Sequence, residues 1–470
     1  MKVEQIYTGC LAQGAYYIES NGEAAVIDPL RETGPYLKRA EESGAKIKYI
    51  FETHFHADFV SGHLDLAEKT GATIVYGPGA DTTFAKHETV DGEILELGAL
   101  KIKVLHTPGH TPESTCYLLY DENGKEYAVF TGDTLFIGDV GRPDLAQKKG
   151  SLTKEDLAGW LFDSLRNKLM PLPDDVLVYP AHGAGSACGK NMSSETWSTI
   201  ASQKMTNYAL RANMTREEFI QEVTDGLAAP PQYFAKNAKI NKTGYESIDL
   251  VMERGARALT PDEVVAAVEQ ENALVLDVRA AQLFCKGHVP GSVSIGLDGQ
   301  FAPWVGALIT DLMQPIVVIA DKGREEETVV RLARVGYDNC IGYLEGGMAA
   351  WEKAGKEVEK LESIPADELA KRYHKDPSIK IIDVRKPSEF NSDHLRDVEN
   401  VPLDFINDNM NVFDKDQQYY LLCRSGYRSV VFGSILKARG FHNLVDIAGG
   451  YNEVLKTDMP RAEALSEFTA

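Results

Sequence analysis

Two histidines and an aspartate stand at alternate positions in the run THFHADF, residues 53–59. Side chains at alternate positions point the same way while a backbone stays extended. The apolar residues 49–51 directly before the run indicate that a strand ends here, so His54, His56 and Asp58 can converge on a cation as the strand opens into a loop. The run therefore predicts a metal site at the end of a strand.

This spacing resembles the HxHxDH signature of the metallo-β-lactamase superfamily, although Phe59 stands where the superfamily has a final His. Three more fragments follow in the superfamily's order: TPGHTP at 107–112, TGDT at 131–134 and YPAHG at 179–183. The resemblance implies metal ligands at His54, His110 and Asp133. For three further residues it leaves ligation and an orienting role equally open: His56, Asp58 and His182.

Two imidazoles and one carboxylate form the facial triad of non-haem Fe(II) oxygenases, in which other coordination positions stay open for substrate and dioxygen. Binuclear hydrolases use two metals to make and aim hydroxide, and losing a His at position 59 should weaken a second site. We therefore expect one Fe(II) per chain. Zinc is the alternative, because Asp58, Asp133 and His182 could form a partial second site and a single zinc ion can also support hydrolysis.

A second reactive segment, CRSGYRS at residues 423–429, follows the apolar run 419–422. A cysteine between a buried strand and a helix lies among backbone N–H groups at the positive end of the helix, which lowers the pKa of the thiol and favours thiolate. Arg424 and Arg428 can add positive charge. Such a loop can hold a thiolate or persulfide at Cys423 and bind anionic sulfur compounds such as thiosulfate and sulfite.

This segment lies in the second copy of an internal repeat. The matched segments, at one constant offset, are LVLDVR at 274–279 with KIIDVR at 380–385, and Phe284 and His288 with Phe390 and His394. Both copies resemble rhodanese sulfurtransferase domains. The first copy has Asp321 at the position of Cys423, followed closely by a glutamate run, and a carboxylate is a poor persulfide carrier. We expect that copy to be inactive and to serve packing or positioning.

Two other segments offer candidate substrate contacts. FIGDVGRPD at 136–144 is similar to a family segment near the metal cleft, which implies that Arg142 could pair with a carboxylate on the substrate thiol and that Asp144 could fix Arg142 or its loop. A surface ion pair is the alternative. Cys188 follows His182 by six positions in a run of small residues, and could be a mobile thiol that accepts persulfide sulfur or a small residue in a tight turn.

The elements that position these residues indicate an α/β protein. Strand patterns at 24–27 and 102–105 alternate with a helical pattern at 35–43. A length of 470 residues predicts roughly three domains of about 150 residues each. We expect an αββα metallo-β-lactamase sandwich with its closing helices and linker at 1–252, an inactive rhodanese-like domain at 253–358 and a catalytic rhodanese domain at 359–470.

Composition excludes some partners. A formal net charge of -21 opposes association with nucleic acid or anionic lipid. The N-terminus lacks the basic start and apolar core of a signal peptide, and no run of about 18 apolar residues suggests a membrane span. The six scattered cysteines form no CxxC pair, so a reducing cytoplasm fits best. Homo-oligomerisation stays open.

The combination of a metallo-β-lactamase domain with two rhodanese units resembles the persulfide dioxygenase-sulfurtransferase fusions of bacterial sulfide detoxification. The resemblance implies that O2 oxidises a low-molecular-weight thiol persulfide to sulfite at iron, and that sulfur transfer at Cys423 gives thiosulfate. Two alternatives remain open. One is a zinc-dependent thioester hydrolase of the glyoxalase II kind with accessory sulfurtransferase units, and the other is a sulfur carrier or scaffold. The sequence does not identify the carrier thiol.

Overall fold

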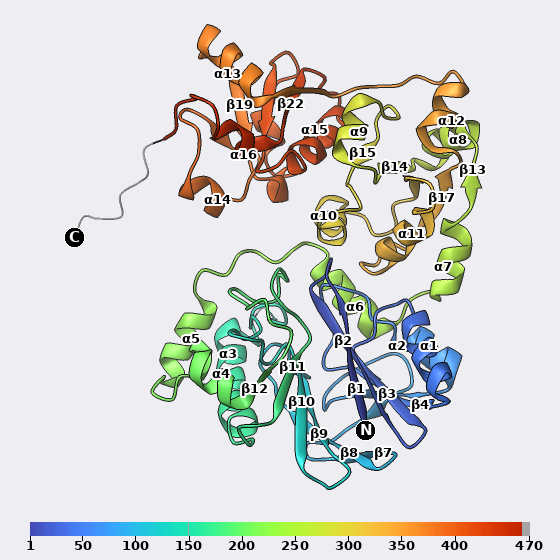
Figure 1. Cartoon of the computed structure of the whole chain (residues 1–470), viewed down its shortest axis with the longest axis vertical. Helices are drawn as coiled ribbons and strands as arrows, with labels where there is room; N and C mark the ends of the chain where they lie inside the picture. Colours follow the sequence, from blue (N-terminus) through green and yellow to red (C-terminus); the bar gives the residue numbers. More distant parts are fainter. Residues whose placement is uncertain (149, 463–470) are drawn as a thin grey trace, which may run out of the picture. The chain divides into compact units, whose positions relative to one another are not determined.

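The computed structural model describes residues 1–148 and 150–462 (Figure 1). The chain forms two compact units. The first is Met1–Leu250 together with Leu332–Gly336, and the second is Val251–Arg331 together with the chain from Tyr337 onward. We keep the limits at residues 252 and 358 as proposed domain boundaries. Among the described helices, none has the length and apolar character needed to cross a membrane.

The first unit contains two six-stranded sheets, in the orders β1-β2-β3-β4-β5-β6 and β12-β11-β10-β9-β8-β7. The strands are β1 Lys2–Thr8, β2 Gln13–Ser20, β3 Glu23–Ile27, β4 Lys46–Phe51, β5 Thr73–Tyr76, β6 His87–Glu88, β7 Ile94–Leu97, β8 Leu100–His106, β9 Thr115–Tyr120, β10 Glu126–Gly132, β11 Leu177–Pro180 and β12 Ser198–Thr199. One buried cluster takes side chains from both sheets, and Phe51 of β4 meets Tyr117 of β9 with ring centroids 4.7 Å apart. The two sheets therefore share a core between them.

Helices cover the outer face of each sheet (Figure 1). They are α1 Gly34–Ser43 and α2 His63–Thr70 on the first sheet, and α3 Lys154–Ser164, the π-helical turn η1 Leu165–Leu169, α4 Ile200–Thr206, η2 Tyr208–Leu210 and α5 Arg216–Thr224 on the second. Strand β2 shows the consequence, because Tyr16 enters the core between the sheets while Tyr17 packs in the cluster under α1. The predicted αββα sandwich is confirmed. α6 Phe234–Thr243 and α7 Ile248–Gly255 follow.

The second unit contains two five-stranded sheets whose strand pairs are all parallel, with matching orders β13-β17-β16-β14-β15 and β18-β22-β21-β19-β20. The first copy comprises β13 Ala258–Leu259, α8 Pro261–Glu271, β14 Leu274–Asp277, α9 Ala281–Lys286, β15 Val293–Ser294, α10 Phe301–Leu308, β16 Ile316–Ile319, α11 Glu325–Ala333, β17 Cys340–Leu344 and α12 Gly347–Lys353. The second comprises β18 Glu362–Pro365, α13 Ala366–Lys375, β19 Lys380–Asp383, α14 Pro387–Ser392, β20 Glu399–Asn400, η3 Leu403–Phe405, η4 Met410–Val412, β21 Tyr419–Leu422, α15 Arg428–Ala438, β22 Leu444–Ala448 and α16 Gly450–Val454. The predicted repeat is confirmed as two copies of one α/β fold.

Helix α15 is buried without interruption from Ser429 to Leu436. One side packs on its own sheet, against β21 and β22, and the other meets β15 and α9 of the first copy. There Ser434 accepts a hydrogen bond from the backbone N–H of Ser294 (2.9 Å). The first copy therefore covers the helix that follows the predicted sulfur-transfer loop.

Candidate functional site

The three predicted metal ligands come together in the first unit. His54 follows β4, His110 lies between β8 and β9, and Asp133 follows β10. His54 Nε2 lies 3.8 Å and His110 Nε2 3.5 Å from the same carboxylate oxygen, Asp133 Oδ2. Each residue is about 1% exposed. Gly132 permits this approach, because a Cβ there would lie 2.6 Å from the Thr53 side chain.

This arrangement fits a divalent cation. Burial, and then the neighbouring His56, His110 and His182, hold the pKa of His54 well below its usual range, so that imidazole is neutral. Within residues 1–148 and 150–462, neither carboxylate oxygen of Asp133 has a hydrogen-bond partner. A buried carboxylate is costly unless it is paired or coordinates a metal. Neutral imidazoles and a carboxylate suit several transition metals, so the donor set is compatible with both iron and zinc.

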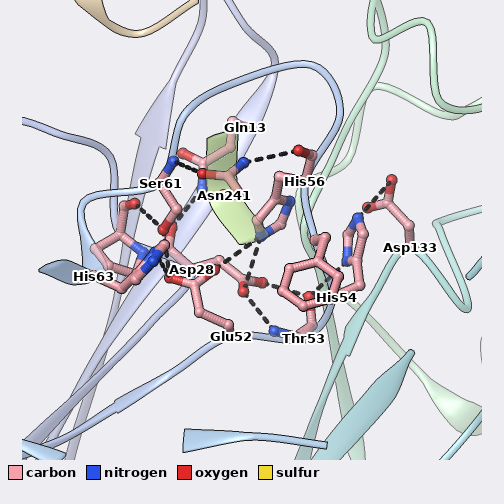
Figure 2. Close-up of polar contacts among 12 residues, drawn as sticks. Gln13, Asp28, Glu52, Thr53, His54, His56, Ser61, His63, Asp133 and Asn241 are labelled. Carbon is pink, nitrogen blue, oxygen red and sulfur yellow. Dashed lines mark hydrogen bonds and ion pairs between the residues drawn. The ribbon is translucent and has the colours of Figure 1, made fainter. Parts of the chain in front are cut away.

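Hydrogen bonds orient both imidazoles toward Asp133. Thr53 Oγ1 donates to Asp28 Oδ2 (2.9 Å) and therefore accepts from His54 Nδ1 (3.0 Å), as Figure 2 shows. His110 Nδ1 donates to the backbone oxygen of Arg142 (2.8 Å). In each ring Nδ1 is a hydrogen-bond donor, and Nε2 faces the shared carboxylate. Such outer partners fix the tautomer of a metal-binding histidine.

His56 lies in two other groups of candidate ligands, one with Asp58 and His182 and one with Asp28 and Glu52. In the described part of the chain its Nδ1 has no hydrogen-bond partner. Its Nε2 lies 3.0 Å from Asp28 Oδ1 and 3.5 Å from Glu52 Oε2 (Figure 2). Burial alone would lower the pKa of His56, but the neighbouring carboxylates, Asp28 foremost, raise it to about 9. Among the described residues His54, His56 and Asp58 do not form one group of candidate ligands: His54 groups with His110 and Asp133, and His56 groups with Asp58 and His182. Metal binding by His56 and Asp58 stays a prediction.

Sequence reasoning missed the polar network around His56. Asp28 accepts hydrogen bonds from the backbone and side chain of Thr53, while Glu52 accepts one from Ser61 and lies 3.4 Å from His63 Nδ1. The signal was available in the apolar run that ends at Asp28, because β3 pairs in parallel with β4 and their carboxyl ends meet.

His182 belongs to two groups of candidate ligand atoms beside the first group, which is His54, His110 and Asp133: one with His56 and Asp58, and the other with Asp133 and Cys188. His182 Nε2 lies 3.5 Å from Asp58 Oδ2 and 3.6 Å from Asp133 Oδ1. Candidate ligand atoms of Asp133, His182 and Cys188 all lie within 4.8 Å of one another. Burial, followed by the charges of Asp58 and Asp133, raises the pKa of the Cys188 thiol well above its usual range.

Hydrogen bonds hold the loop that carries Cys188, at the cysteine and just after it. The backbone N–H of Arg142 donates to the Cys188 carbonyl (3.0 Å). Asp139 Oδ2 accepts from the backbone N–H groups of Lys190 (2.6 Å) and Asn191 (2.7 Å). These bonds hold the backbone of the loop, and a role of the Cys188 thiol as sulfur acceptor stays a prediction.

The Arg142 side chain makes a buried clamp. Its Nε and Nη2 donate to the two carboxylate oxygens of Asp144 (2.7 and 2.8 Å). Further hydrogen bonds run to the carbonyls of Ala187 (3.3 Å) and Ala228 (2.5 Å). This geometry favours the loop-fixing alternative for the pair. A direct contact between Arg142 and substrate stays a prediction.

Cys423 lies between β21 and α15, 1% exposed, as the sequence predicts. The backbone N–H of Gly426 donates to its Sγ (3.1 Å). Ser429 Oγ lies 3.3 Å from Sγ and donates to Asp446 Oδ1 (2.6 Å), so the thiol can donate to Ser429. A backbone donor aimed at Sγ is the feature that would hold a thiolate or persulfide anion.

The two loop arginines differ in their surroundings. Arg424 is exposed. Arg428 binds Glu389 in bidentate fashion (2.6 and 2.8 Å). In the first copy Asp321 is exposed, and Arg324 pairs with Asp298 (2.8 Å) and Glu327 (2.9 Å). In the first copy, carboxylates therefore neutralise Arg324, which lies in the loop that corresponds to the Cys423 loop of the second copy.

Comparison with known families gives two matches. Residues 8–182 match the metallo-beta-lactamase superfamily, and residues 260–354 and 365–457 each match the rhodanese-like domain. The two rhodanese matches fall on the two copies of the repeat. The metallo-beta-lactamase match includes His54, His110 and His182, and ends before β12, α4 and α5 of the sandwich.

Several relatives share the first domain. A probable hydroxyacylglutathione hydrolase of Schizosaccharomyces pombe is 34% identical over 35% of this chain, which spans only 60% of that protein. The mitochondrial persulfide dioxygenase ETHE1 of Mus musculus is 30% identical over 44% of this chain and 73% of its own. A crystal structure titled as a metallo-beta-lactamase from Staphylococcus aureus is 32% identical, with a TM-score of 0.63, and covers 73% of this chain and 98% of its own. The chain therefore belongs to the metallo-β-lactamase superfamily, has persulfide dioxygenases and glyoxalase II enzymes among its relatives, and joins that fold to two rhodanese-like domains.

Proposed function

We propose that this protein is an Fe(II)-dependent persulfide dioxygenase with a built-in sulfurtransferase. The observation that carries the proposal is the pairing of two sites in one chain: His54, His110 and Asp133 as a facial triad, and Cys423 in a rhodanese loop. Phe59 supports it, because its ring stacks on His56 (4.2 Å between centroids) and offers no ligand for a second metal of the hydrolase type.

The proposed overall reaction is RSSH + O2 + H2O → RSH + SO3²⁻ + 2 H⁺. Bound Fe(II) would supply the redox chemistry and open positions for sulfur and dioxygen. The protein keeps His54 neutral by burial, and Thr53 and the Arg142 carbonyl hold each imidazole with Nε2 toward the ion. Asp133 contributes the negative charge that offsets part of the cation's charge.

The second reaction would take place at the Cys423 loop. Attack of the Cys423 thiolate on the outer sulfur of RSSH breaks the S–S bond, releases RSH and leaves a cysteine persulfide. Sulfite then attacks that sulfur, which gives thiosulfate and restores the thiolate. The Gly426 N–H stabilises the anion on Sγ at both stages. We assign this chemistry to sulfide and persulfide detoxification in the cytoplasm, with a low-molecular-weight thiol as carrier.

A zinc-dependent thioester hydrolase is the second candidate. Its support is the set of hydroxyacylglutathione hydrolases related at similar identity, together with the Asp58 and His182 donors beside the first group. This activity would not consume O2.

The test compares iron-loaded and zinc-loaded enzyme, both loaded without oxygen, with synthetic persulfides of several carrier thiols. We expect O2 uptake with iron alone. Cys423→Ser should keep O2 uptake and accumulate sulfite in place of thiosulfate, whereas Cys340→Ser, a buried cysteine outside the loop, should behave as wild type. Absence of O2 uptake by the iron-loaded protein with every carrier, together with thioester hydrolysis by the zinc form, would overturn the proposal in favour of the second candidate.

A further inference from the structure

We propose that Asp446 is a positioning residue for sulfur transfer, which takes up the proton of the Cys423 thiol through Ser429 and so supplies the thiolate. Cys423, Ser429 and Asp446, here called the relay, are all buried. The inference rests on the proposed sulfur transfer at Cys423 and goes beyond it, because it names the group that receives the thiol proton.

The relay is one continuous set of hydrogen bonds. Ser429 Oγ, at the start of α15, lies 3.3 Å from Cys423 Sγ and donates to Asp446 Oδ1 of β22 (2.6 Å). Ser363 of β18 donates to the other carboxylate oxygen, Oδ2 (2.7 Å). Because the Ser429 proton is used on Asp446, the lone pairs of Ser429 Oγ are left to accept the thiol proton. The relay can therefore carry a proton from sulfur to carboxylate.

Asp446 is an unusual residue for its strand. β22 belongs to a parallel sheet, whose covered strands are normally apolar throughout. Its neighbours Val445 and Ile447 lie in the apolar cluster under α13 and α16. Asp446 points to the opposite face of the sheet, toward α15. A buried carboxylate costs free energy unless it is paired or hydrogen-bonded, so a role at the cysteine is a better explanation than packing.

The inactive copy of the repeat lacks this carboxylate. Tyr343 of β17 and Asp446 of β22 each stand three positions before the Gly-Gly pair that follows the strand. Ala258 pairs with Tyr343 in the first copy as Ser363 pairs with Asp446 in the second. The carboxylate and its Ser363 partner thus occur in the copy that has the cysteine, and a phenol ring and a methyl group replace them in the other.

The proton transfer leaves the net charge of the relay unchanged. The S–H bond of Cys423 breaks as its proton passes to Ser429 Oγ, and the Ser429 O–H bond breaks as its proton passes to Asp446 Oδ1. The products are a thiolate and a neutral carboxyl group. Ser429 then donates to the thiolate together with the Gly426 N–H. When sulfite later restores the thiolate from the persulfide, the proton returns by the same route.

Burial makes Asp446 a suitable acceptor. It raises the pKa of this carboxyl group from 3.8 to about 6. The group is still ionised at neutral pH and can accept a proton, but it holds that proton more firmly than an exposed aspartate does. A general base is most effective when its pKa lies near the operating pH. The same burial that destabilises the carboxylate therefore brings it closer to a thiol in proton affinity.

Most titratable groups on the neighbouring elements keep one charge state near pH 6. Burial, followed by the charge of Asp446, raises the pKa of Cys285 on α9 to about 12. The charged groups beside the loop are exposed Arg424 and the ion pairs of Arg428 with Glu389 and Arg385 with Asp383. Asp404 of η3 is the exception, because desolvation by its surroundings raises its pKa although the side chain reaches solvent. A control has to separate Asp404 from Asp446.

The experiment measures the rate at which iodoacetamide alkylates Cys423 in the full-length protein as a function of pH, followed by mass spectrometry of the peptide that contains Cys423. Wild type should show two rises in rate, the first near pH 6, where Asp446 becomes able to accept the proton, and the second at higher pH. Asp446→Asn and Ser429→Ala should each lose the first rise and keep the second.

Matched variants test whether the first rise belongs to the relay. Asp404→Asn should keep it. Ser434→Ala should keep it too, since Ser434 is a buried serine of the same helix that accepts a hydrogen bond from Ser294 instead. Circular dichroism shows whether each variant is folded, and Ser429→Ala decides the question if Asp446→Asn is not.

Two results would overturn the proposal. A single rise in wild type would mean that Cys423 has no internal proton acceptor, and a first rise that survives both Asp446→Asn and Ser429→Ala would mean that another group is the acceptor. Alkylation needs no sulfur donor and no metal. The outcome is therefore independent of whether Cys423 transfers sulfur and of whether the first unit consumes O2.

Discussion

Asp28 is the residue whose replacement tests the site's construction most directly. It lies just after β3 with a positive φ of 49° and touches no candidate ligand of the first group. Its carboxylate accepts from the Thr53 backbone (2.8 Å) and Thr53 Oγ1 (2.9 Å), and lies 3.0 Å from His56 Nε2. Thr53 Oγ1 in turn holds His54. Asp28→Asn keeps the size of the side chain but removes its charge and one acceptor.

The expected loss of metal affinity follows from this series of contacts between Asp28, Thr53 and His54. With an amide at position 28, Thr53 Oγ1 is no longer obliged to donate there and can donate to His54, which favours the wrong tautomer. Loss of an outer partner of a metal-binding histidine lowers metal affinity by roughly 10–100-fold, or about 1.4–2.8 kcal/mol. Asp28→Ala removes two hydrogen bonds to a charged acceptor, both from Thr53, and the ion pair with His56. At about 1.5 kcal/mol for each of the two hydrogen bonds it should also destabilise the fold by about 3 kcal/mol.

The assay is competition for the metal held by His54, His110 and Asp133 with a chelator of known affinity. Asp65→Asn is the matched control. Asp65 is buried in the same unit and accepts from the Ile248 backbone (2.8 Å), but it lies in another network. Metal affinity in Asp28→Asn within about twofold of wild type, well below the effect of a typical outer partner, would refute the idea that Asp28 sets the His54 tautomer.

Two other expected outcomes concern the sulfur-transfer loop. Burial raises the pKa of Asp446 from 3.8 to about 6. The folded state therefore favours the protonated carboxyl group. About 3 kcal/mol of folding stability, present below pH 3.8, should be lost as the pH rises through about 6. Asp446→Asn should flatten the pH dependence of urea unfolding in this range, and a wild-type profile that is already flat would contradict the burial argument. Gly450 has a φ of +61°, and a Cβ there would lie 2.3 Å from the Cys423 carbonyl oxygen. Gly450→Ala should lower the free energy of unfolding by about 2–5 kcal/mol through backbone strain and overpacking. It should reduce sulfur transfer from thiosulfate to a thiol acceptor and leave O2 uptake unchanged. Gly355→Ala is the control, because Gly355 has a positive φ with open space around it, and this variant should leave sulfur transfer intact.

The sequence predicted the parts of the fold that leave a local pattern. The run Ile316–Ile319 is apolar throughout because strands of a covered parallel sheet are buried on both faces. The matching apolar run at β21 helped to identify the repeat and predicted that Cys423 lies at the end of a strand. His54, His110 and Asp133 were found because their fragments occur in a known order, although their spacing alone would not have shown which residues share an ion.

The remaining features depend on contacts that no local pattern encodes. His56 pairs with Asp28 through Nε2 because Asp28 approaches it from a different strand, after the parallel pairing of Ile27 with Phe51. Arg142 is held by the carbonyl of Ala228, far along the chain. Cys188 was noticed only for its distance in sequence from His182. Its neighbours Asp58 and Asp133 became visible only when the loops were placed together.

The burial of α15 has a consequence for how this gene can change. Tyr427, at the start of that helix, donates to the Gly296 carbonyl (3.0 Å), and its ring lies about 3.1 Å from where a Gly296 side chain would begin. Deletion of the first copy would leave this apolar helix of the second copy uncovered on the side that β15 and α9 now contact. Changes in the covering surface of the first copy are therefore constrained by the packing of the second copy, whatever residue stands at position 321.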